Sequence, residues 1–127
     1  MQYLALALCV AALASCSRAE VQAVRSLPIA HVDLSQVGDG AYTGQYGYAG
    51  FTYEVQVTVS GHRITGVELL HNRTTKQAKM AAGVAARVVD QQRNDVDAVS
   101  GATTTSKAIL KAIENALTGP LQRLGPA

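Results

Sequence analysis

The sequence is poor in the residues that build disulfide-stabilised and metal-binding domains. It contains two cysteines, Cys9 and Cys16, and three histidines that share no metal-ligand spacing. Because Cys9 lies inside an N-terminal apolar stretch and Cys16 at its end, the rest of the chain has no thiol and no disulfide. We therefore expect a domain that is stabilised by packing alone, has no metal site and takes any redox chemistry from a cofactor.

Strong charge of one sign is also missing. Eleven Lys and Arg residues against nine Asp and Glu residues give a formal net charge of +2, with no dense basic cluster. The sequence therefore gives no reason to expect nucleic-acid binding. Its 127 residues allow one domain with a modest hydrophobic core.

A long apolar run is absent as well, because the N-terminal apolar stretch, residues 3–14, is too short to span a bilayer well. It suits the hydrophobic region of a secretory signal, although only Gln2 precedes it and the usual Lys or Arg is missing. Its end, Leu13-Ala14-Ser15-Cys16, resembles a lipobox. We expect residues 1–16 to be a signal peptide and Cys16 to carry a lipid that anchors the exported protein to the extracytoplasmic side of the membrane. Simple secretion, with cleavage near Ala19, is the alternative.

The middle of the chain predicts a small antiparallel sheet. Residues 17–39 have no sustained period, and we expect them to be a tether between the membrane anchor and the domain. Residues 41–50 form a tyrosine- and glycine-rich strand, and residues 51–60 alternate between apolar and polar side chains, as in a half-buried strand. Gly61 marks a hairpin turn before a returning strand over residues 64–70.

Two main helices are expected to cover one face of this meander, which gives an α+β fold over residues 40–118. The first spans about residues 76–92, with Met80, Val84 and Val88 on its inner face. A short strand over residues 96–99 precedes the second helix, whose end is predicted by Gly119 and Pro120, before a tail over residues 119–127. The apolar residues of the second helix share one face: Ile109, Ala112, Ile113, Ala116 and Leu117.

The start of the second helix carries the most informative pattern in the chain. A tight turn at Gly101 leads into four consecutive hydroxyl side chains, Thr103, Thr104, Thr105 and Ser106. A helix start has unpaired N–H groups and a partial positive charge, so this position favours an anion such as phosphate. A helix capped by Ser and Thr, without a ligand, is the alternative interpretation.

The string Asp97-Ala98-Val99-Ser100-Gly101-Ala102-Thr103 resembles the flavinylation motif of the FMN-binding domain family. That family includes the flavin-bearing subunits of sodium-translocating NADH:quinone reductases, their Rnf-type relatives and small secreted proteins. The resemblance covers about residues 40–117 and implies FMN as the cofactor, joined as a phosphoester to Thr103 by a transferase that uses FAD as donor. Thr104 and Thr105 remain alternatives for the attachment. The cofactor-binding residues that it implies are Ser100, Gly101, Ala102, Thr103, Thr104 and Thr105.

Residues around this motif are assigned roles with alternatives. Asp97 matches the required acid of the motif, as a recognition element for the transferase, a turn-stabilising side chain or a magnesium ligand during transfer. Lys107 lies one turn after Thr103 and is placed either to pair with the phosphate or to face solvent. Thr74 matches the threonine of a second flavin-contacting segment, commonly Glu-Thr-Pro-Gly, in which Arg73 here replaces the Glu. We expect Arg73 to be exposed, or else to face the flavin or a negatively charged partner.

The resemblance implies an electron-transfer protein that exchanges electrons with a membrane redox partner. No nicotinamide site or substrate pocket can be recognised in so short a chain, so we assign no catalytic residue. A module that binds FMN without a covalent bond, a flavin-free lipoprotein and a small flavin reductase with its own substrate are the alternatives.

Overall fold

The computed structural model describes residues 18–123, and side chains as far as residue 119. The predicted signal peptide and Cys16 lie outside this range. An N-terminal helix (residues 18–25) precedes the other elements. These are η1 (Leu34–Gln36), β1 (Gly40–Tyr48), β2 (Phe51–Ser60), β3 (Arg63–His71), α2 (Lys76–Ala81), α3 (Gly83–Gln91) and α4 (Thr103–Arg123). None of the helices in residues 18–123 has both the length and the hydropathy needed to cross a bilayer.

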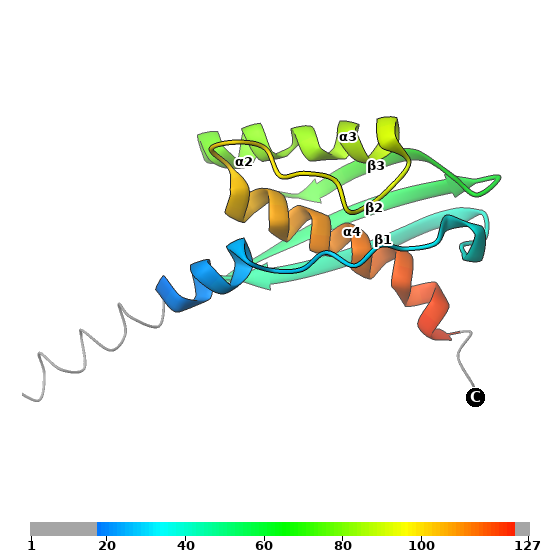
Figure 1. Ribbon diagram of the computed structural model, residues 1–127, viewed down its shortest axis with the longest axis horizontal. Helices are drawn as coiled ribbons and strands as arrows, with labels where there is room; N and C mark the ends of the chain where they lie inside the picture. The colour runs from blue at the N-terminus through cyan, green and yellow to red at the C-terminus, as the bar shows by residue number, and fades with distance from the viewer. Residues whose placement is uncertain (1–17, 124–127) are drawn as a thin grey trace, which may run out of the picture.

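The three strands form one antiparallel sheet in the order β1-β2-β3, which confirms the predicted α+β meander (Figure 1). The alternation in β2 is confirmed too, because Tyr53, Val55, Val57 and Val59 are all buried. The β2–β3 turn has positive φ at both central positions, as a tight two-residue hairpin requires, with 58° at Gly61 and 60° at the residue after it.

Helices cover the inner face of the sheet, with α4 on β1 and β2 and α3 on β3 (Figure 1). The predicted apolar face of α4 is confirmed, since Ile109, Ala112, Ile113, Ala116 and Leu117 are all buried. Helix α4 lies very close to the sheet at Gly44 of β1, where a Cβ atom would lie 2.1 Å from the carbonyl oxygen of Ala112. The backbone of α4 therefore rests directly on the backbone of β1.

The predicted helix over residues 76–92 is divided at Ala82 into α2 and α3. Its buried positions include Ala78, Ala81, Val84 and Val88, which confirms the two valines. The assignment of Met80 to the inner face is wrong, because its side chain is 40% exposed. The small alanines form the contact of α2 with the core, and Met80 lies one position away from that stripe.

The predicted strand over residues 96–99 is not formed, and these residues run as a loop. Their polar backbone groups are satisfied by side chains instead of by a neighbouring strand: Arg87 Nη1 donates to the carbonyl oxygens of Asp97 and Ala98, at 2.9 and 3.2 Å. The predicted end of α4 near Gly119 is also wrong, since the helix continues to Arg123. A proline can adopt helical dihedral angles at the cost of one backbone hydrogen bond, so Pro120 does not end this helix.

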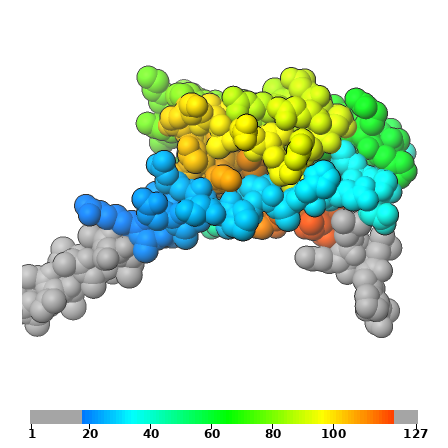
Figure 2. All heavy atoms as spheres, in the orientation of Figure 1, coloured from blue at the N-terminus to red at the C-terminus, as the bar shows by residue number. Residues whose placement is uncertain are grey.

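The segment that we expected to be a tether packs on the domain over its described residues. Val24, Val32 and Val37 are buried in the common core. Figure 2 shows the blue and cyan atoms of this segment covering much of the orange α4 helix that Figure 1 shows behind them. Residues 26–38, which we call the strap, therefore belong to the folded unit.

Two buried polar side chains hold the strap in place. Asn94 accepts a hydrogen bond from Val32 N at 2.9 Å and donates one to the carbonyl oxygen of Ala30 at 2.6 Å. Glu114 of α4 accepts a hydrogen bond from Ala30 N at 2.5 Å and pairs with Lys111. The strap is thus fixed by backbone hydrogen bonds to two separate parts of the fold.

Candidate functional site

The first turn of α4 presents backbone donors that the fold leaves free. Ala102 occupies the position before the helix, and its carbonyl oxygen accepts the first helical hydrogen bond, from Ser106 N at 2.9 Å. Alanine has no side chain that can cap the next N–H groups. Within the described part of the chain, no hydrogen bond uses the backbone N–H groups of residues 103–105. These three donors and the helix dipole favour a negatively charged group at this position.

The turn that leads into α4 is fixed by its own side chains. Gly101 has a φ of 82°, and a Cβ atom there would lie 3.6 Å from Met80 Cε. The buried hydroxyl of Ser106 accepts a hydrogen bond from Val99 N at 3.1 Å, which ties the helix back to the loop before the turn. The backbone of residues 99–106 is therefore held in shape before any ligand binds.

Replacing Ser106 with alanine should weaken this turn. The variant leaves Val99 N without its acceptor, and we expect the free energy of unfolding to fall by about 1–3 kcal/mol. Urea denaturation of the unmodified protein measures this change. Ser100→Ala is the matched control, because Ser100 is exposed in the same turn, and a change within about 0.5 kcal/mol is expected. Equal stability of the two variants would show that the Ser106 hydroxyl does not hold the turn.

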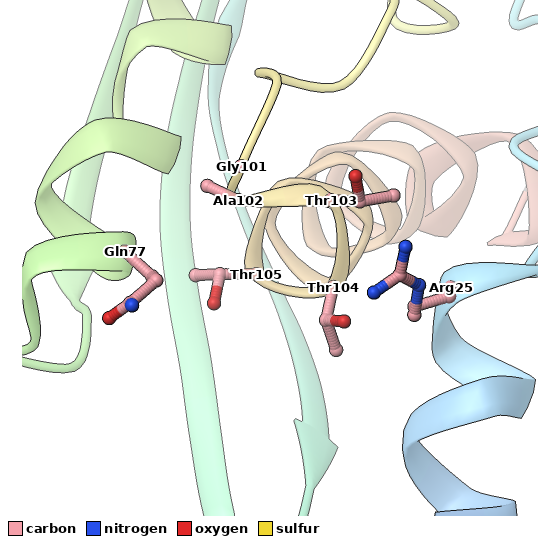
Figure 3. Close-up of a pocket in the computed structure, with 7 residues that line it drawn as sticks. All are labelled: Arg25, Gln77, Gly101, Ala102, Thr103, Thr104 and Thr105. Atoms are coloured by element: carbon pink, nitrogen blue, oxygen red, sulfur yellow. The ribbon is translucent and has the colours of Figure 1, made fainter.

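Residues 101–105 line a pocket of about 240 Å³ together with Arg25 of the N-terminal helix and Gln77 of α2. Figure 3 shows the Arg25 guanidinium beside Thr103 and Thr104, with Gln77 on the other side of the helix start, beside Thr105. Neither Arg25 nor Gln77 was a sequence candidate. Both are distant from the motif in the chain, and no local pattern marks them.

The three threonines of the pocket differ in accessibility. Thr103 and Thr104 are partly exposed, whereas Thr105 is only 7% exposed. Thr105 faces Tyr53, whose pKa is raised to about 12 by burial and by Tyr48, against the opposing effects of the Thr105 hydroxyl and the Arg73 charge. Thr103 and Thr104 are therefore the more accessible threonines of the pocket.

Thr74 does not line this pocket. It belongs to a second pocket of about 500 Å³, whose lining also includes Phe51, His71, Asn72, Arg73 and Thr75. The rings of Phe51 and His71 are stacked there, with centroids 4.5 Å apart. The two segments that sequence reasoning linked to one ligand thus line separate pockets.

Arg73 is only partly exposed, and its guanidinium is bound by the fold. Its Nε donates a hydrogen bond to the Tyr53 hydroxyl at 2.9 Å, and its Nη2 donates to the carbonyl oxygen of Tyr48 at 3.1 Å. The guanidinium also lies 4.8 Å from the centroid of the Phe51 ring. Full exposure of Arg73 is therefore wrong, because the guanidinium joins the β1–β2 turn to the loop after β3; that Arg73 faces the flavin stays a prediction.

The remaining candidates lie outside the pocket lining. Ser100 and Asp97 are exposed, and Lys107 is partly buried. Among the described residues, the Asp97 carboxylate takes part in no hydrogen bond that would hold the turn, while Arg87 contacts its backbone carbonyl. Cys16 lies outside the described residues. In the part of the chain described, no group of three or more His, Cys, Asp and Glu side chains is arranged to hold a metal ion.

Two comparisons with known proteins match large parts of the chain. A family model described as "FMN-binding domain" matches residues 47–118, which include residues 101–105 but not Arg25. An "Uncharacterized protein" of Treponema pallidum (strain Nichols) is 36% identical over 88 residues, which is 68% of this chain and 24% of that protein. The chain therefore spans about a quarter of the length of this relative.

Proposed function

Because the chain belongs to the FMN-binding domain family, we propose that it carries FMN as a phosphoester on Thr103 and acts as an extracytoplasmic electron-transfer protein. FMN binding follows from the family. The observation that carries the attachment site is the partly exposed Thr103 at the start of α4, beside three free N–H groups.

The residues of the pocket suit a phosphate group. The N–H groups of residues 103–105 can donate to its oxygens, and no acidic residue lies in the first turn of α4 to repel it. Arg25 supplies a positive charge from the opposite wall. Bound FMN would bring one- and two-electron redox chemistry that the side chains lining the pocket lack.

Among the described residues that line the pocket, no side chain could activate Thr103 for self-attachment. The pocket lining in the described residues contains neither a carboxylate nor a histidine, which supports attachment by a separate transferase. In that reaction, a bond forms between the Thr103 oxygen and the phosphorus of the FMN half of FAD. The pyrophosphate bond breaks, AMP leaves, and the hydroxyl proton passes to a base on the transferase. The exposed Asp97 carboxylate suits recognition by that enzyme.

Export and a lipid on Cys16 complete the proposal. Residues 3–14 resemble the hydrophobic region of a secretory signal, and Cys16 follows a lipobox-like string. A covalent bond suits an exported protein, because a weakly held cofactor would be lost by dilution outside the cytoplasm. A membrane redox partner would then supply or accept the electrons.

Reversible FMN binding is the second candidate, and the same observation favours it. Three free N–H groups and Arg25 can hold a phosphate without any ester bond. The two candidates differ in whether FMN survives denaturation of the protein.

Mass spectrometry of the peptide that spans residues 96–107 tests the attachment. Protein produced together with an FMN transferase should gain the mass of FMN less one water on this peptide, and protein produced without the enzyme should not. An unmodified peptide under both conditions would contradict covalent attachment, and FMN released on denaturation would support the reversible candidate.

A further inference from the structure

Arg25 belongs to a part of the chain that the family match does not cover, yet it lines the pocket at the start of α4. We propose that Arg25 is a phosphate-binding residue that the N-terminal segment adds to the FMN site, an inference that rests on the proposed function. The segment before the family domain would thus complete the cofactor site as well as lead to the membrane.

The charge of Arg25 is available for a ligand. Three other arginines are engaged by the fold: Arg73 by Tyr53, Arg87 by the loop before α4, and Arg93 by Asp95. Among the described residues, by contrast, Arg25 forms no hydrogen bond or ion pair. Every other residue that lines the pocket in the described chain is uncharged. Arg25 is therefore the charged side chain that this pocket offers to an anion.

The position of Arg25 is set by the core and by the strap. Its neighbour Val24 is buried, and Leu27 N donates a hydrogen bond to the carbonyl oxygen of Val24 at 3.1 Å. The strap that follows is bound at residues 30–32 by Asn94 and Glu114. The guanidinium thus extends from a packed segment toward Thr103 and Thr104 (Figure 3).

The guanidinium of Arg25 and the phosphate of FMN are chemically complementary. A guanidinium can donate two parallel hydrogen bonds to a phosphate, and these charge-assisted bonds are stronger than bonds between neutral groups. A phosphate esterified to both the protein and the ribityl chain keeps one negative charge. Arg25 would balance that charge, while the N–H groups of residues 103–105 bind the oxygens.

Binding of FMN and of riboflavin to the full chain, produced without transferase, tests the role of Arg25. Riboflavin is the informative probe because it has the same ring system but no phosphate. We expect Arg25→Gln to weaken FMN binding roughly tenfold and to leave riboflavin binding unchanged. Arg18→Gln is the matched control, since Arg18 is exposed on the same helix and lies outside the pocket lining, and it should alter neither. Equal FMN binding by Arg25→Gln and wild type would overturn the proposal, and so would an equal loss for both probes.

The flavin-loaded chain provides a second readout that needs no reversible binding. The rise in melting temperature on covalent loading should be smaller in Arg25→Gln than in wild type and in Arg18→Gln. An adduct that stabilises all three chains equally would reject the role of Arg25 and leave the proposed function intact. If FMN binds reversibly, depends on Arg25 and forms no adduct, the covalent attachment is rejected. The phosphate-binding role of Arg25 is then supported. Wild-type protein that neither binds nor acquires FMN would reject both.

Discussion

Thr103→Ala should abolish the covalent flavin completely. The variant removes the hydroxyl oxygen that would bond to phosphorus, so the FMN-sized mass gain on the peptide of residues 96–107 should disappear. Thr103 is partly exposed at the first position of α4, and its replacement should change the free energy of unfolding by no more than about 1 kcal/mol. Circular dichroism of the variant separates loss of the attachment site from loss of the fold.

Two companion variants sharpen this result. Thr103→Ser keeps a hydroxyl at the same position and should keep the adduct. Thr104→Ala removes the other accessible hydroxyl of the pocket and should also keep it. An adduct that persists in Thr103→Ala and disappears in Thr104→Ala would move the attachment to Thr104.

Gly44→Ala should be severely destabilising. The added Cβ would lie 2.1 Å from the Ala112 carbonyl oxygen and 2.4 Å from Ala116 N, distances at which α4 must move away from β1. Because both atoms belong to the helix backbone, no side-chain rotation can relieve the contact. We expect the free energy of unfolding to fall by about 3 kcal/mol or more, measured by urea or thermal denaturation.

Gly66→Ala is the control for this substitution. Gly66 lies in β3, and a Cβ atom there would meet nothing within 4 Å. Its stability should stay within about 1 kcal/mol of wild type, because only the strand preference of the residue changes. If the two variants were equally stable, the close approach of α4 to β1 would be wrong.

Elements with a strong local pattern could be predicted from the sequence. The alternation in residues 51–60 specifies which side chains of β2 are buried, and Gly61 accommodates the positive φ of the hairpin. The spacing of Ile109, Ile113 and Leu117 likewise specifies the buried face of α4. In each case the periodicity of one element is enough to identify its buried face.

Features that depend on distant contacts could not be predicted in this way. Residues 96–99 have the composition of a strand but no strand partner, because side chains of α3 and α4 satisfy their backbone groups. Residues 17–39 show no period in the sequence. Asn94 and Glu114, which are far away in the chain, hold their described part by hydrogen bonds to its backbone. A period of 2 or 3.6 residues cannot reveal such contacts.

The candidate site also contains both kinds of feature, those set by local sequence and those set by distant contacts. Local sequence locates the glycine turn and the threonines, because Gly101 and the start of α4 are neighbours in the chain. It does not reveal that Arg25 reaches them from the N-terminal helix, or that Arg73 binds within the fold. The motif therefore specifies the threonines of the pocket, whereas the positive charge in its lining is specified by tertiary structure.

Denaturation of the chain purified from its native host, followed by flavin fluorescence in the denaturing gel and by intact mass, tests the central claim most directly. A phosphoester on Thr103 predicts a fluorescent band at the position of the chain and a mass greater, by one FMN less one water, than that of Thr103→Ala from the same host, once the mass of the substitution itself is allowed for. A colourless chain whose mass differs from that of Thr103→Ala by the substitution alone, or flavin released into the denaturant, would contradict it.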